Sequence, residues 1–161
     1  MIRRILIVFG LLASLALVAW EVSKKERLLA GGVVVHLALA PVDPRSLMQG
    51  DYMQLDYAIA RRTTYDQSWP RDGALVVQAD ESGVAQFVRL DRGEPLETSE
   101  RRLTYRIRGG RLQVGTNAYY FQEGDANRYE DARYGELRVA RDGTSLLVAL
   151  LDERQQRLGD R

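Results

Sequence analysis

The sequence contains no cysteine in its 161 residues. Disulfide bonds, thiol catalysis and metal sites built on thiolates are therefore excluded. The absence is compatible with an oxidising compartment, where chains without disulfides also occur, but does not by itself place the protein there.

Histidine is almost as scarce, since His36 is the only one. A metal site needs several ligands, and the sequence offers no second histidine or any thiolate. A serine–histidine–aspartate triad would require Ser46 to meet His36, and the spacing does not indicate it. We expect His36 to be a structural residue in a strand and predict neither a metal nor a cofactor.

An excess of charge of one sign is also lacking. The chain has 23 basic and 22 acidic residues, and the formal net charge is +1. The basic residues are almost all arginine and are scattered, without a stripe interleaved with aromatic residues. The composition therefore does not predict a nucleic-acid ligand.

A single long apolar run is present, from residue 5 to Trp20, behind Arg3 and Arg4. At about 1.5 Å per residue, a helix extended to Val22 nearly crosses a hydrocarbon core of about 30 Å. The end of the run is a poor cleavage site for a signal peptidase, although the small residues inside it would permit cleavage. We favour an uncleaved signal-anchor in the inner (cytoplasmic) membrane, with Trp20 at the interface and residues from about 30 onward outside the cytoplasm.

The chain is predicted to divide into three parts. Residues 1–27 hold the cytoplasmic leader, the signal-anchor and a juxtamembrane linker. Residues 28–152 form one extracytoplasmic β-domain, and the polar residues 153–161 form a frayed tail. No internal repeat or second domain is evident.

The soluble part lacks a long apolar period of 3.6 residues, and its pattern is that of short strands. The fold class predicted is mainly β, a single antiparallel barrel or sandwich-like domain after the helix. Residues 33–40 and 51–60 read as strands, the second with Met53, Leu55, Tyr57 and Ile59 on one face. Hairpins are predicted at 74–91, at 103–115 around Gly109-Gly110, and at 134–153 around Asp142-Gly143.

The stretch "APVDPRSLMQGDY" carries prolines and a glycine that predict a rigid turn before a strand. Its charges are dense, and we expect Asp43, Arg45 and Asp51 to form a fixed polar cluster supported by Gly50. Acidic residues elsewhere, such as Asp56, Asp125 and Asp131, are typical of turns, but they leave open a carboxylate pair for glycoside hydrolysis.

The segment "GDYMQLDY", Gly50 to Tyr57, resembles the pattern that names the GDYXXLXY family of bacterial membrane-anchored proteins. The motif positions are Gly50, Asp51, Tyr52, Leu55 and Tyr57. The later "YYFQEGDANRYEDARYGELRV" resembles the second block of the family. The resemblance implies a membrane-anchored protein without an assigned activity, of a kind encoded beside, or fused to, multi-spanning membrane proteins.

The order of elements is also similar to type I signal peptidases, which are anchored β-proteins with a Ser/Lys dyad. "DPRSLMQGDYMQL", "FVRLDRGEP" and "GDANRYEDAR" are similar to three of their segments, in the same order. The dyad itself is missing, because its serine would fall near Pro41 or Val42 and its lysine on Arg89. A guanidinium, with a pKa above about 12, cannot act as the base. We therefore expect Arg89 to pair with a carboxylate from the Gly50–Asp51 region or from the block Gly124–Asp131.

The leading prediction is a non-catalytic, membrane-anchored extracytoplasmic β-domain that is an accessory or assembly partner of an integral membrane protein. Two alternatives stay open: a hydrolase with a carboxylate or Ser46 site, and a periplasmic peptide- or glycan-binding module with an exposed strand edge. The residues predicted to form the motif and its polar cluster are Asp43, Arg45, Gly50, Asp51, Tyr52, Leu55, Tyr57, Arg89, Gly124, Asp125, Asp131 and Arg133.

Overall fold

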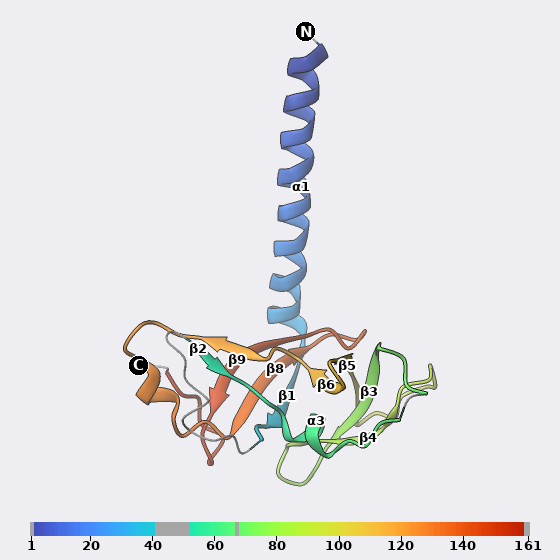
Figure 1. Ribbon diagram of the computed structural model, residues 1–161, viewed down its shortest axis with the longest axis vertical. Helices are drawn as coiled ribbons and strands as arrows, with labels where there is room; N and C mark the ends of the chain where they lie inside the picture. Colours follow the sequence, from blue (N-terminus) through green and yellow to red (C-terminus); the bar gives the residue numbers. More distant parts are fainter. Residues whose placement is uncertain (1, 41–51, 67, 160–161) are drawn as a thin grey trace.

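A computed structural model shows one long N-terminal helix standing on a β-domain (Figure 1). The structure describes residues 2–40, 52–66 and 68–159, and for residues 2, 3, 5 and 6 the backbone alone. The predicted fold class is confirmed: the domain is mainly β, its paired strands are antiparallel, and one apolar helix precedes it.

Helix α1 spans Ile2–Gly31 and has 30 residues. Its segment Ile7–Gly31 is long and apolar enough to cross a membrane, and none of the most apolar part is buried against the rest of the chain. The helix continues well past Trp20 and includes the residues predicted to form a juxtamembrane linker. Residues 24–30 are mostly good helix formers, and the helix ends at the first of two consecutive glycines, Gly31 and Gly32.

The strands of the β-domain form three antiparallel sheets. One sheet has the order β1-β8-β9, a four-stranded sheet has the order β4-β3-β5-β6, and β2 pairs with β7. The bounds are β1 Val33–Ala38, β2 Tyr52–Gln54, β3 Asp72–Ala79, β4 Ala85–Leu90, β5 Glu100–Arg108, β6 Arg111–Val114, β7 Ala118–Tyr120, β8 Tyr134–Val139 and β9 Ser145–Leu151.

The two larger sheets curl around one core and form an incomplete barrel. On one side, a parallel bridge between His36 and Val84 joins β1 to the start of β4. On the other side β6 and β9 are the end strands of their sheets, and no strand pairing among the described residues joins them. The backbone N–H of Thr104 donates to the carbonyl of Gly143 at 2.9 Å, which closes only one end of this open side.

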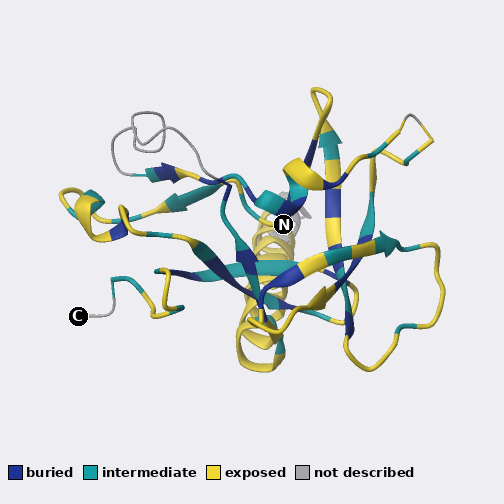
Figure 2. Cartoon of the chain, turned by 90° about the horizontal axis from the view of Figure 1, so that it is seen from below, coloured by how far each residue is buried: buried dark blue, intermediate teal, exposed yellow. Residues whose placement is uncertain are grey.

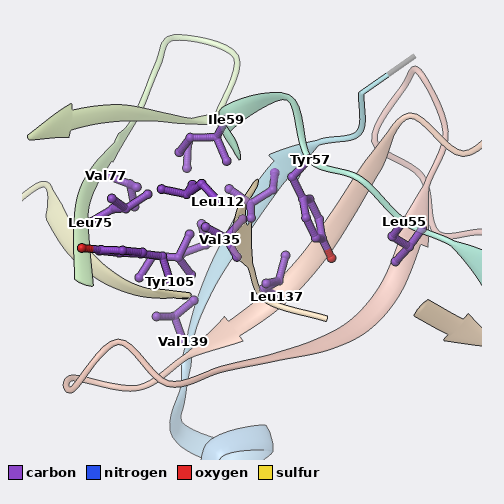
Figure 3. Packing of buried hydrophobic residues seen from close by; sticks show 14 of the residues in the cluster. Val35, Leu55, Tyr57, Ile59, Leu75, Val77, Tyr105, Leu112, Leu137 and Val139 are labelled. Carbon is purple, nitrogen blue, oxygen red and sulfur yellow. The ribbon is translucent and has the colours of Figure 1, made fainter. Parts of the chain in front are cut away.

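The core lies between the two sheets. In Figure 3, Val35 and Leu137 from one sheet point toward Leu75 and Tyr105 from the other. Side chains alternate between the two faces along each strand, and these four lie on the inward faces. Leu75 and Leu137 are completely buried. Seen from below, buried segments run along the sheets while the connecting loops are exposed (Figure 2).

The strand predicted for residues 51–60 is much shorter in the structure. Strand β2 ends at Gln54, and the short helix α3 spans Ala58–Arg62. The predicted inward face is nevertheless buried, with exposed fractions of 2 to 7% for Met53, Leu55, Tyr57 and Ile59. The alternation survives because the chain stays extended to Tyr57, and the first turn of α3 then places Ile59 on the core. Alanine and arginine favour a helix there.

The hairpin turns differ from one another in backbone conformation. Gly109 and Gly110 both have positive φ, as a two-residue type I′ turn requires, which confirms that prediction. The turn at Asp142-Gly143 is not of this kind, because only Gly143 has positive φ. The carbonyl of Ala140 instead accepts from Gly143 N at 3.0 Å, and Thr144 O accepts from Ala140 N at 2.8 Å, which gives a longer loop with a glycine bulge.

Candidate functional site

The described half of the GDYXXLXY motif contributes to packing. Tyr52 is half-buried, and its ring lies 5.7 Å from the ring of Tyr120 across the β2–β7 pair. Leu55 and Tyr57 are both buried in the core. Asp43, Arg45, Gly50 and Asp51, together with Ser46, lie outside the described residues, so the polar cluster expected there stays a prediction.

Tyr57 has a buried hydroxyl without a hydrogen-bond partner in the described chain. Gly115 and Gly135 flank it, since a Cβ added at either glycine would lie 3.6 Å from the Tyr57 hydroxyl. Burial raises the pKa of Tyr57 far above its usual value, so the phenol stays neutral. The last tyrosine of the motif is therefore a buried ring in a slot formed by two glycines.

Arg89 lies on β4 and binds two carboxylates of the chain that follows. Its Nε lies 3.2 Å from Glu94 Oε2, and its Nη2 lies 3.2 Å from Glu100 Oε2. The predicted partners were a carboxylate near Asp51 or one from the block Gly124–Asp131. Among the described residues, the carboxylates at Arg89 come instead from the β4–β5 connection (Glu94) and the first residue of β5 (Glu100). The Gly50–Asp51 region lies outside the described residues, so a contact from there stays a prediction.

Arg102 on β5 makes a second, similar set of contacts with the β4–β5 connection. Its Nε lies 2.6 Å from Asp91 Oδ2, and its Nη2 donates to the carbonyl of Glu94 at 3.2 Å. The hydrogen bond from Arg102 is the main cause that holds the pKa of Asp91 below its ordinary range. Val76 is paired with Arg89 on one side and Arg102 on the other, so the two arginines hold residues 91–99 beside the centre of the sheet. We call these contacts the arginine clamp.

The block Gly124–Arg133 forms an exposed turn that includes the 3₁₀ helix η1, Ala126–Tyr129. Asp125 pairs with Arg128 at 3.2 Å, and Asp131 is exposed. The guanidinium of Arg133 donates to the carbonyl of Ala132 at 3.0 Å. Within the described part of the chain, no ion pair joins this turn to Arg89, so Arg89 and the block Gly124–Arg133 do not form one site there.

Sequence reasoning missed the residue that fixes this turn. Tyr129 is buried, and its ring lies 5.2 Å from Tyr119 and 5.4 Å from Phe121. The sequence does indicate such packing, because aromatic residues are concentrated around the acidic and basic residues of this block. The interpretation of the block rested on its charged residues instead. Aromatic packing, and not an ion pair to the core, therefore holds the second block.

A second missed cluster lies around Glu136, a carboxylate on β8 whose residue is only 6% exposed. Arg157 binds it with Nη2 at 2.7 Å and Nε at 3.1 Å. The hydrogen bond from Arg157 is the main cause that lowers the pKa of Glu136. Burial of the carboxylate opposes this shift, and the arginine outweighs it.

His36 is part of the same cluster and is held by Gln155. Its Nδ1 lies 2.8 Å from Gln155 Oε1, while Gln155 Nε2 donates to Ser82 O at 2.7 Å. Because the Gln155 oxygen accepts, Nδ1 of His36 carries the proton. His36 Nε2 lies 3.9 Å from Glu136 Oε2. These contacts give the only histidine a structural environment.

The C-terminal tail, for which the sequence predicts fraying over residues 153–161, makes hydrogen bonds to the domain over its described length, up to Gly159. Leu158 N donates to Leu150 O at 2.8 Å, and the backbone of Arg157 forms an antiparallel β-bridge with that of Leu151. Gln155 even adopts a left-handed φ of 58°, a strained conformation that its two side-chain hydrogen bonds offset. Polar residues stay ordered here because they meet buried polar partners.

A polar hollow of about 1110 Å³ lies on the open side of the barrel. Its walls come from β3, β5, the end of β6 and the β8–β9 turn. Among the described residues, the hollow included, no group of three or more histidine, aspartate or glutamate side chains could hold a metal ion.

Comparison with known proteins gives one match. Neither the curated proteins nor the solved structures contain a match to this chain. The resemblance to type I signal peptidases thus stays a prediction from sequence. The model of one protein family, described as GDYXXLXY protein, matches residues 14–150 and so covers most of the helix and nearly all of the β-domain. The chain belongs to the GDYXXLXY protein family.

Proposed function

We propose that this protein is a non-catalytic, membrane-anchored accessory domain that assembles with an integral membrane protein. The observation that carries the proposal is the junction between the helix and the domain. α1 ends at Gly31 and β1 begins at Val33, so a single residue, Gly32, separates them.

The junction is rigid because it is bonded on both sides. The N–H of Gly32 donates to the carbonyl of Leu28 at 2.8 Å, and Arg138 Nη1 donates to Gly32 O at 3.1 Å. There is no room for a larger residue, since a Cβ on Gly32 would lie 2.5 Å from Leu28 O. A domain fixed to its anchor suits a partner of defined geometry, whereas a tethered enzyme that meets diffusing substrates gains from a flexible linker.

The chemistry of the arginine clamp supports a structural role. Arg89 stands where the related peptidases are expected to have a lysine, and it is already paired with Glu94 and Glu100. A guanidinium cannot accept the proton of a serine hydroxyl, so it cannot activate a serine. Among the other acidic residues considered for hydrolysis, Asp56 is paired with Arg61 and Asp125 with Arg128.

The proposal includes an orientation. The helix is a signal-anchor of the inner membrane, with the short leader of Arg3 and Arg4 in the cytoplasm and the β-domain in the periplasm. Two observations support an intact anchor: the helix runs without a break into the domain, and cleavage near Leu28 would remove the first contact of the junction.

The partner is expected to bind the exposed helix. Side chains such as Phe9 and Leu17 are 70% and 68% exposed, and small residues such as Gly10 and Ser14 allow close approach of a second helix.

The test is chemical cross-linking of the tagged full chain in native membranes, followed by measurement of complex mass. The matched control replaces residues 5–20 by leucine and keeps both charged flanks, so that insertion is preserved. We expect a stoichiometric complex with a multi-spanning protein for the wild type and its loss in the leucine variant. A wild-type chain found only at the mass of the monomer, which is 18.2 kDa plus the tag, would overturn the proposal.

A further inference from the structure

The end strand β9 presents an unpaired backbone edge on the open side of the barrel. Thr144 O accepts from Ala140 N at 2.8 Å and so faces β8. Ser145, the next residue, directs its backbone N–H and C=O to the opposite side. At the far end Leu150 and Leu151 are paired with the tail. Between residues 145 and 149, only β8 pairs with this strand in the described chain.

The polar hollow begins at the first residue of this edge. Ser145 and Thr144 line one wall, and Gln113 and Asn117 line the wall beyond the end of β6. A residue in a strand occupies roughly 160 Å³, from a strand spacing of about 4.8 Å, a sheet spacing of about 10 Å and a rise of about 3.3 Å. The volume of about 1110 Å³ thus corresponds to an extended segment of about seven residues.

The lining chemistry suits a peptide backbone better than an ion or a ring. Six lining residues carry a hydroxyl or amide side chain, and four are charged, two of each sign. Asp72 and Arg106 neutralise each other at 3.3 Å. The one aromatic residue in the lining, Tyr105, is only 2% exposed and offers no face on which a ring could stack.

We propose that this hollow receives an extended peptide segment, which adds to the free edge of β9 as a further strand. The inference rests on the proposed function, since the segment comes from the extracytoplasmic part of the membrane partner. The position fits: the β8–β9 turn lies at the same end of the domain as the base of α1 (Figure 1), so a segment leaving the membrane can reach it.

The test uses the absence of cysteine to place single thiols. Ser145→Cys and Gln113→Cys put a thiol on the two walls, and Val88→Cys puts the control on β4, where the side chain is 43% exposed. The probe is a membrane-impermeant maleimide applied to the full chain in native membranes and after purification in detergent. We expect the two wall thiols to react about tenfold more slowly in native membranes, and the control thiol to react equally in both.

A second arm blocks the edge itself. Ser145→Pro removes the outward N–H, and proline is tolerated at the first residue of an edge strand. We expect about tenfold less cross-linked complex than for the wild type, whereas Ser145→Ala leaves its amount unchanged. Equal reactivity of the wall thiols in membranes and detergent, while the complex is present, would overturn this inference alone. Absence of any complex would overturn the proposed function with it.

Discussion

At the scale of single residues, guanidinium groups join parts of the domain that no hairpin connects. Arg89 and Arg102 hold the connection between β4 and β5, Arg138 holds the helix junction, and Arg157 holds the tail. Their partners are partly buried carboxylates or carbonyl oxygens, which the planar, multidentate donor of arginine matches. The sequence shows these arginines only as scattered charges, because each partner is brought close by folding.

The arginine clamp gives the first prediction. Arg89→Met leaves Glu100, a residue 6% exposed, without its cation. Because Arg89 itself is 31% exposed and Glu100 also accepts from Glu97 N, we expect a loss of about 1 to 3 kcal/mol in unfolding free energy. Arg89→Lys keeps the charge and should lose less. Thermal melts in detergent measure the stability of the two variants, and a peptide-cleavage assay measures their peptidase activity.

No peptidase activity is expected from the wild type or from Arg89→Lys. Turnover by the wild type that Arg89→Met abolishes without destabilising the fold would contradict the structural role of this residue.

Tyr57 gives the second prediction at this scale. Tyr57→Phe keeps the ring in its glycine slot and removes a buried hydroxyl that has no described partner. We expect the unfolding free energy to stay the same or to rise by about 1 kcal/mol, whereas Tyr57→Ala should cost about 3 to 5 kcal/mol. Chemical denaturation of the two variants distinguishes these effects. A clear loss of stability in Tyr57→Phe would show that the hydroxyl has a bonding partner.

At the scale of elements, the strands could be predicted because local pattern and tertiary environment agree. The alternation in 33–38 and 103–107 and the double glycine at 109–110 specify strands and a turn without further information. The short helix α3 could not be predicted, because its three apolar residues, Ala58 to Ala60, also fit an extended pattern. The order of the tail could not be predicted either, because it depends on buried partners on β1 and β8 that are far away in sequence.

The candidate site was less predictable than the fold. The motif residues Leu55 and Tyr57 look functional in a named pattern, yet their burial assigns them to the core. The hollow left no signal in the sequence, since it arises where the last strands of two sheets fail to meet.

The tail gives the third prediction, which depends on pH. The pKa of Glu136 is lowered from its ordinary value of 4.5, so its ion pair stabilises the fold above about pH 4.5 and is lost as the pH falls through the lower folded value. Arg157 is 47% exposed, so Arg157→Ala should cost about 1 to 2 kcal/mol at pH 7. The difference from the wild type should shrink below pH 4.5.

Urea unfolding at pH 7, 4 and 3 measures this difference, and Arg154→Ala, an exposed arginine on the same tail, is the control. A difference that is independent of pH would contradict the assignment of Arg157 to Glu136.

At the scale of the whole molecule, the β-domain stands beyond the apolar part of the helix. Eleven residues, from 21 to 31, separate Trp20 from the end of α1, which is about 16 Å of helix at 1.5 Å per residue. If Trp20 lies at the interface, this segment is a rigid stalk that holds the domain at a set height. The fourth prediction concerns the side of the membrane on which the β-domain lies.

A reporter that is active only outside the cytoplasm, fused after the last residue of the chain, should be active. Activity of a cytoplasmic reporter at the same position would reverse the orientation. A mature chain that begins near Leu28 would show instead that the anchor is cleaved.

We propose that anchor and domain act as one rigid piece that assembles with a membrane partner. The most direct measurement inserts a flexible segment of six glycine and serine residues between Gly31 and Gly32 and compares the cross-linked complex with that of the wild type. A control inserts the same segment after Gly83, in an exposed hairpin turn. We predict that the junction insertion abolishes the complex while the domain keeps its melting temperature, and that the control insertion does not. An undiminished complex with the flexible junction would contradict the account.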